Sequence, residues 1–117
     1  MALEFTIEPS SDPILVHLAG RLTLGPQLGP FGRQVAAAIA SRRPTAVLLD
    51  VGKVEEVDSS GLGELVILYT TAGQHQCRLC LIGPSPRVLR LLETTRLSGL
   101  LPHFDSRAEA LRHLRPQ

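Results

Sequence analysis

Aromatic residues are scarce in this 117-residue sequence, which contains one Tyr, three Phe and no Trp. Proteins that bind single-stranded nucleic acids stack bases on aromatic side chains, and proteins that bind duplexes present a strongly basic surface. The formal net charge here is only +1. The composition therefore argues against nucleic-acid binding, and the aromatic share of 3% predicts a core built from aliphatic side chains.

Long apolar segments are missing as well. No run of about 18 apolar residues is present, and the N-terminus lacks the charged segment and the apolar stretch of a secretory signal. A chain of this length buries about two-thirds of its unfolded surface without metals or disulfides. We therefore expect a single domain over residues 1–117, no contact with a membrane, and a location in the cytoplasm.

Residue patterns that would support catalysis or metal binding are also missing. The two cysteines, Cys77 and Cys80, lead into a predicted strand, where residues three apart point to opposite faces. We interpret them as core residues rather than as a redox or zinc pair. The four histidines share no ligand or triad spacing, and neither a G-x-S-x-G nor a G-x-x-x-x-G-K-[ST] motif occurs. The sequence therefore predicts a protein that is not an enzyme and has no metal or cofactor.

The most informative stretch covers residues 45–73. Residues 46–51 are apolar except for Asp50, which is typical of a central strand buried on both faces. A short polar link is predicted next, and we interpret its carboxylates as solvated rather than as ligands of a divalent cation. A helix should follow, with a buried face formed at helical spacing by Leu62, Leu65, Val66 and Tyr69.

Polar residues mark the start of this helix. Asp58, Ser59 and Ser60 lie where backbone N–H groups have no helical partners and the macrodipole is positive. Such a position suits a capping side chain, from Asp58 or Ser59, and it also suits a phosphate attached to a serine. The opposite helical face is available to another chain and consists of Ser60, Gly63, Glu64, Ile67 and Thr70.

The N-terminal elements are predicted from turn chemistry and apolar spacing. An edge strand over residues 3–7 and a second strand over residues 14–19 should form an antiparallel hairpin, and Gly20 should end the second strand. A helix is predicted next. It begins either at Pro30 or with an opening turn near Pro26, and it ends before the following proline.

The C-terminal elements carry clear start signals. A strand is predicted over residues 78–82, and Ser85 followed by Pro86 should open a helix. A short edge strand is expected at residues 103–105, and Ser106 should cap a last helix. The resulting order, β-β-α-β-α-β-α-β-α, predicts an α/β fold with a mixed sheet whose later strands are parallel.

Residues 58–63 (DSSGLG), placed after a buried strand and at the start of a helix, resemble the signature of the STAS domain family, the anti-sigma-factor antagonists. The resemblance covers nearly the whole chain and includes residues 20–22 (GRL) and residues 83–88 (GPSPRV), which enter the third helix. It implies a STAS-like mixed β-sheet with helices packed mainly on one face.

The resemblance also implies a partner-switching regulator. In this family the unphosphorylated antagonist binds an anti-sigma factor that is also a serine kinase. The kinase uses ATP to phosphorylate a serine of the motif, which dissociates the complex, and a phosphoserine phosphatase reverses the step. The implied phosphoacceptor is Ser59, directly after the aspartate. The residues expected to contact the partner are Asp58, Ser60, Gly61, Gly63, Glu64, Ile67 and Thr23.

The loop after the second strand departs from the family pattern. Many antagonists have an acidic residue followed by Leu-Asp there, whereas this sequence has Arg21, Leu22 and Thr23. Thr23 supplies no carboxylate, which bears on the choice of partner. Similar domains also act as stressosome scaffold subunits, as domains of anion transporters and as subunits of lipid-transport complexes. A constitutive assembly subunit, in which Ser59 only caps the helix, is therefore the alternative function.

Overall fold

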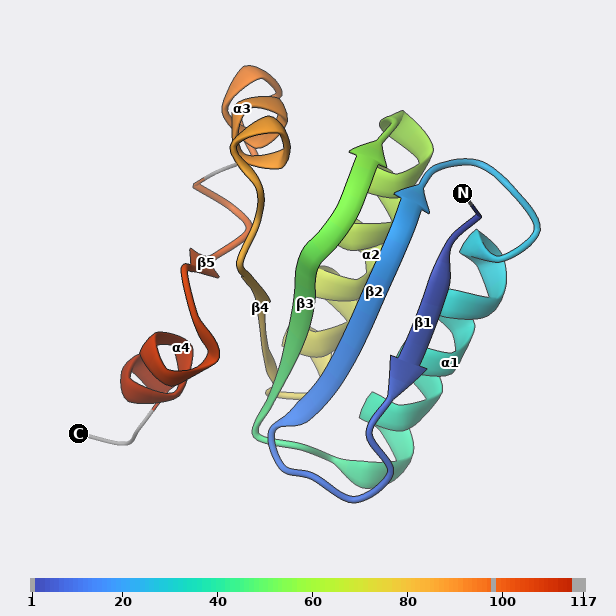
Figure 1. Cartoon of the computed structure of the whole chain (residues 1–117). Helices are drawn as coiled ribbons and strands as arrows, with labels where there is room; N and C mark the ends of the chain where they lie inside the picture. The colour runs from blue at the N-terminus through green and yellow to red at the C-terminus, as the bar shows by residue number, and fades with distance from the viewer. Residues whose placement is uncertain (1, 98, 115–117) are drawn as a thin grey trace.

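The computed structural model describes residues 2–97 and 99–114, which form one five-stranded sheet and four helices (Figure 1). The strands are β1 (Glu4–Ile7), β2 (Ile14–Leu22), β3 (Ala46–Val57), β4 (Arg78–Ile82) and β5 (His103–Phe104). The helices are α1 (Leu28–Arg42), α2 (Ser59–Gln74), α3 (Pro86–Thr94) and α4 (Arg107–Leu114). The predicted element order is confirmed. None of the helices in these two ranges is long and apolar enough to cross a membrane.

The strands lie side by side in the order β1-β2-β3-β4-β5. β1 is antiparallel to β2, and each later pair of neighbours is parallel, so the predicted mixed sheet is confirmed. Helices α1 and α2 lie behind the sheet in Figure 1, and apolar residues of α3 join the same core. Helix α4 packs on the opposite face, against β2, β3 and β4. Three of these four helices therefore cover one face, as the resemblance implied.

Alternate residues of the central strands fill two separate cores. Val47 and Leu49 of β3 belong to the large core beneath α1 and α2, whereas Leu48 belongs to the small core beneath α4. Both faces of this strand are thus buried, as its apolar run predicted. Cys77 and Cys80 fall in different cores, and burial raises the pKa of each thiol to about 11. The interpretation of both cysteines as core residues is confirmed.

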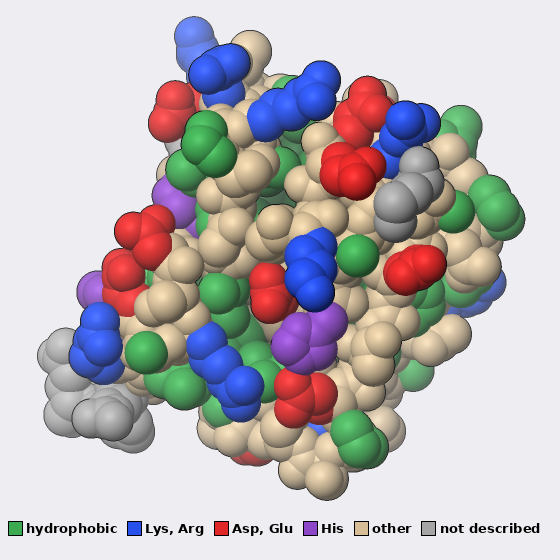
Figure 2. All heavy atoms as spheres, in the orientation of Figure 1, with side chains coloured by type: hydrophobic (Ala, Val, Ile, Leu, Met, Phe, Trp, Pro, Cys, Tyr) green, Lys and Arg blue, Asp and Glu red, His purple; other side chains and the backbone are tan. Residues whose placement is uncertain are grey.

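Polar residues cover the part of the sheet that faces away from α1 and α2 and lies beyond α4. Figure 2 shows acidic, basic and histidine side chains on this face. The Nε2 atom of His17 lies 2.7 Å from Oε2 of Glu8, and its Nδ1 atom lies 3.5 Å from Oδ2 of Asp50. His17 is therefore an exposed residue between two carboxylates. Within residues 2–97 and 99–114, no group of three or more His, Cys, Asp or Glu side chains is placed to hold a metal ion.

Strand β3 is longer than predicted. The polar link expected after Val51 is part of the strand, which continues to Val57 and pairs with β2 as far as Leu22. Two irregularities in this pairing each insert one extra residue on the β3 side. They direct Val51, Val54 and Val57 toward the large core at intervals of three residues. The prediction was wrong because a strand with two bulges loses the period of two.

Strand β2 and helix α1 differ from the prediction at one end each. Gly20 does not end β2, which continues to Leu22. Instead Gly20 is a buried strand residue with φ of 90°, a conformation that glycine adopts without steric cost. Helix α1 begins at Leu28, between the two predicted starts. Pro30 lies in its first turn, where a backbone N–H would lack a helical partner in any case.

Helix α2 buries a face that is rotated from the predicted one. Val66 and Tyr69 were expected to be buried, but both are only half-buried. Residues 65–69 are apolar throughout, so helical spacing alone does not distinguish one buried face from its neighbour. Packing against α1 and β4 decides between them. The apolar side chains that are buried are Leu62, Leu65, Leu68 and Ala72.

The caps of the last two helices form as predicted. The Oγ atom of Ser85 accepts a hydrogen bond from the N–H of Val88 at 3.2 Å, and a proline occupies the first turn of α3. The Oγ atom of Ser106 accepts a hydrogen bond from the N–H of Glu109 at 3.1 Å. These caps join residues three apart, so a short sequence pattern was sufficient to predict them.

Candidate functional site

The start of α2 is capped by a single side chain. Asp58 lies between the end of β3 and Ser59, and its Oδ1 accepts a hydrogen bond from the N–H of Gly61 at 2.8 Å. Its backbone is extended, as is typical of an N-cap residue. The capping role that the sequence left open between Asp58 and Ser59 therefore belongs to Asp58.

The second carboxylate oxygen of Asp58 binds a distant part of the chain. Its Oδ2 accepts a hydrogen bond at 3.0 Å from the N–H of Leu24, in the loop between β2 and α1. The N–H of Asp58 in turn donates to the carbonyl of Leu22 at 3.3 Å. The hydrogen bond from Leu24, followed by that from Gly61, holds the pKa of Asp58 below its ordinary value. Asp58 thus joins the start of α2 to the β2–α1 loop.

We expect Asp58 to make the stability of the fold depend on pH in the acidic range. Its pKa is lowered by folding, so its contribution is complete above about pH 4 and is lost as the pH falls through the folded-state pKa. Asp58→Asn cannot ionise. The difference in urea midpoint between wild type and this variant should therefore shrink from pH 7 to about pH 3, and a constant difference would contradict this role for the carboxylate.

Ser59 is the first residue of α2 and is exposed. Its hydroxyl makes no hydrogen bond to any other residue that the structure describes, because Asp58 supplies the cap. The first turn of a helix has N–H groups without helical partners and carries the positive end of the dipole. An exposed hydroxyl therefore lies where an added negative group would be electrostatically favourable.

Gly61, which was expected to contact the partner, is buried and packs against the end of β2. A Cβ atom at this position would overlap the carbonyl oxygen of Leu22 and lie 2.8 Å from its carbonyl carbon. The first turn of α2 therefore rests directly on the backbone at the end of β2. A larger residue would push these two elements apart.

The outer face of α2 combines small and apolar residues. Gly63 is exposed, with no other side chain within 4 Å of its Cβ position, and the side chain of Ile67 is 57% exposed. Ser60 is half-buried, and so is Glu64, which lies over Gly32 of α1. The docking face, as we call it, consists of Ser59, Ser60, Gly63, Glu64 and Ile67. Thr23 is half-buried in the neighbouring β2–α1 loop.

Leu24 was not predicted from the sequence as part of this site. Its side chain is 77% exposed, more than any other large apolar side chain among the described residues, while its N–H is held by Asp58. An apolar side chain on an anchored loop is available to a partner. The available signal was a leucine directly before Gly25-Pro26, where neither a strand nor a helix would bury it.

Residues 5–102 match the family described as "Mlab, STAS domain". The chain belongs to the STAS domain family. This STAS domain is 27% identical over 114 residues to the anti-sigma F factor antagonist of Paenibacillus polymyxa, and 97% of each chain is covered. It is 29% identical over 94 residues to the anti-sigma-B factor antagonist of Listeria monocytogenes, which covers 80% of this chain and 81% of that protein. The resemblance based on residues 58–63 is therefore confirmed.

Solved structures share the fold of this STAS domain. An anti-sigma factor antagonist from Mycobacterium paratuberculosis matches it with a TM-score of 0.82 at 21% identity, covering 98% of this chain and 96% of that one. The anti-sigma factor antagonist SpoIIAA in its unphosphorylated form matches with a TM-score of 0.74 at 19% identity, covering 97% and 100%. At these identities the similarity establishes the fold.

Proposed function

We propose that this STAS domain is an anti-sigma factor antagonist that changes partners through phosphorylation of Ser59. The observation that carries the proposal is the division of roles at the start of α2. Asp58 caps the helix, and the hydroxyl of Ser59 is exposed and has no capping role. In the alternative function, a constitutive assembly subunit, the only role of Ser59 would be to cap the helix. The geometry favours the switch.

The relatives support this proposal. The relatives from Paenibacillus polymyxa and Listeria monocytogenes described above are anti-sigma factor antagonists. A structure with the same fold, at a TM-score of 0.72 over 96% of this chain, is SpoIIAA in its phosphorylated form. We infer that the partner of this chain is an anti-sigma factor that also acts as its serine kinase, and that a phosphatase restores the unmodified serine.

Phosphate transfer tests the proposal. The protein is incubated with ATP and, separately, with each anti-sigma-type serine kinase of its source, and phosphate incorporation is measured for wild type, Ser59→Ala and Ser60→Ala. We expect incorporation into wild type and Ser60→Ala and none into Ser59→Ala. Loss in Ser60→Ala alone would assign the site to the neighbouring serine. No incorporation into wild type would favour the constitutive assembly subunit.

Substitutions on the docking face should weaken partner binding without unfolding the domain. Ile67→Glu introduces a charge on an exposed surface, so its free energy of unfolding should change by less than about 0.5 kcal/mol. Gly63→Arg should be at least as stable as wild type, because arginine has a higher helix propensity than glycine and the position is open. We expect the affinity for the kinase to fall at least about tenfold. Arg112→Glu on α4, across the sheet, is the control and should bind like wild type. A large loss of stability in Ile67→Glu would show that the side chain of Ile67 packs within the domain and is not available to a partner.

We further propose that the domain has no catalytic activity of its own. The carboxylate nearest to Ser59 in the sequence is Asp58, and both of its oxygens already accept backbone hydrogen bonds. Its lowered pKa also makes it a weak base, so it is poorly suited to remove a proton from the serine. Turnover of a simple ester that disappears in Ser59→Ala would contradict this prediction.

A further inference from the structure

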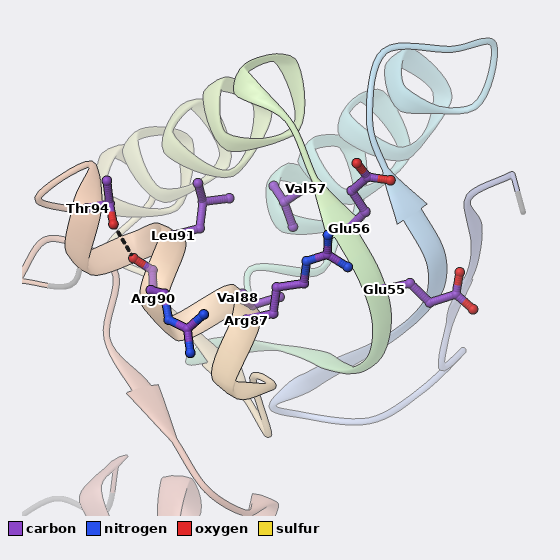
Figure 3. A pocket seen from close by; sticks show the side chains of 8 residues that line it. All are labelled: Glu55, Glu56, Val57, Arg87, Val88, Arg90, Leu91 and Thr94. Atoms are coloured by element: carbon purple, nitrogen blue, oxygen red, sulfur yellow. Dashed lines mark hydrogen bonds between the residues drawn. The ribbon is translucent and has the colours of Figure 1, made fainter.

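A groove lies between the end of β3 and helix α3 (Figure 3). Its volume is 280 Å³. Val88 is buried and Val57 and Leu91 are half-buried, whereas Arg87 and Arg90 are exposed on α3. The groove, which we call the β3–α3 groove, therefore has an apolar floor and a charged rim. It adjoins the candidate site in sequence, because Val57 is followed by the capping aspartate and then by the exposed serine.

One wall of the groove is a strand edge without a strand partner. The pairing of β3 with β4 ends where Asp50 faces Ile82, but the pairing of β3 with β2 continues to Val57. The chain after β4 turns away at Gly83, where φ is +65°, and enters α3. Within the described part of the chain, residues 53–57 therefore have a neighbouring strand, β2, on one side only, and Glu55 is the extra residue of the second bulge. Such an edge presents backbone N–H and C=O groups to an incoming strand.

The charges on the rim favour an acidic occupant. Two acidic residues, Glu55 and Glu56, also line the groove. The carboxylate of Glu55 points away from α3 (Figure 3), and Oε2 of Glu56 lies 3.6 Å from Nε of Arg21 on β2, so the charge of Glu56 is partly compensated. Arg87 and Arg90 make no salt bridge with any residue in the ranges 2–97 and 99–114. A guanidinium group binds a carboxylate through two parallel hydrogen bonds, which makes a carboxylate the matching group.

We propose that the β3–α3 groove binds an extended acidic segment of a partner protein, which adds as a short strand to the free edge of β3. The main chain of the segment forms hydrogen bonds with the backbone of residues 53–57. One of its apolar side chains packs on Val57, Val88 and Leu91. One of its carboxylates forms an ion pair with Arg87 and Arg90. The identification of this partner with the anti-sigma factor rests on the proposed function. A phosphate on Ser59 would then repel the acidic segment as well as any group docked on α2.

A random peptide library displayed on phage tests the groove without any kinase. The library is selected on the unphosphorylated protein and depleted on an Arg87→Glu, Arg90→Glu double variant, whose exposed substitutions should leave the fold intact. Enriched peptides should carry Asp or Glu beside an aliphatic residue and bind the double variant at least about tenfold more weakly. The control, Arg107→Glu with Arg112→Glu on α4, has the same change in net charge and should bind like wild type.

Amide hydrogen exchange of the peptide complex tests the strand addition. Exchange should slow at those amides of residues 53–57 that face the groove, because strand addition places these N–H groups in hydrogen bonds. Failure to enrich any peptide that depends on the two arginines overturns the proposal. Protection confined to the first turns of α2 also overturns it, while leaving the Ser59 switch intact. Conversely, if the protein accepts no phosphate but binds such peptides, the groove proposal is supported and the proposed Ser59 switch is contradicted.

Discussion

Gly61→Ala should destabilise the domain by about 3 kcal/mol or more, a larger effect than most single substitutions produce. The added methyl group would overlap the carbonyl oxygen of Leu22, and this contact involves backbone rather than the end of a flexible side chain. Relief requires α2 to move away from β2. That movement would also stretch the hydrogen bond from the N–H of Asp58 to the same carbonyl.

Gly63→Ala is the matched control, because it makes the same change two residues further along the helix. No other atom outside its local chain lies within 4 Å of the added Cβ, so only helix propensity changes. That difference favours alanine by about 1 kcal/mol. Urea unfolding of both variants should therefore give free energies that differ in opposite directions from wild type. Equal stability of the two variants would show that the start of α2 does not rest on β2.

Elements with local start signals could be predicted from the sequence. The cap of α3 by Ser85 and the cap of α4 by Ser106 depend on bonds between residues three apart, and both were recognised from a few letters. The same holds for β4, whose predicted range, residues 78–82, is the observed one. In each case the information lies in the segment itself, so no knowledge of its neighbours was needed.

Features decided by distant neighbours could not be predicted in the same way. The end of β3 was assigned to a polar link because its bulges arise from the pairing with β2, which the spacing of valines does not reveal. The orientation of α2 depended on whether Leu68 or Val66 faced the core, and packing against α1 and β4 decided it. A long apolar helix offers several equivalent faces, so tertiary contacts select one.

The candidate site also combines features set by local sequence with features set by distant neighbours. The motif in residues 58–63 identified the helix start from the sequence, whereas the exposed serine is Ser59 rather than Ser60, which was predicted on the outward face and is half-buried. The hydrogen bond from Leu24 to Asp58, which links residues 34 apart, was not predictable, and neither was the exposure of Leu24 that accompanies it. Together with the hydrogen bond from Gly61, this bond occupies both oxygens of Asp58, so the cap needs no serine hydroxyl.

Ser59→Asp should weaken binding to the kinase partner by about a hundredfold without unfolding the domain. At an effective dielectric constant near 20, a negative charge about 5 Å from a carboxylate of the docked chain costs about 3 kcal/mol. The same charge is favourable within the domain, since it lies at the N-terminus of α2. Folding and binding should thus respond in opposite directions to one substitution.

Ser59→Ala separates the charge from the loss of the hydroxyl. Because Asp58 is the cap, the alanine variant should be as stable as wild type and should remain bound to the kinase in the presence of ATP. Gln74→Glu, at the other end of α2, makes the same change in net charge and should bind like wild type, which excludes a general charge effect. Affinities are measured by titration calorimetry and stabilities by urea unfolding. If Ser59→Asp binds as tightly as wild type, a charge at this position does not release the partner, and the constitutive assembly subunit becomes the better description.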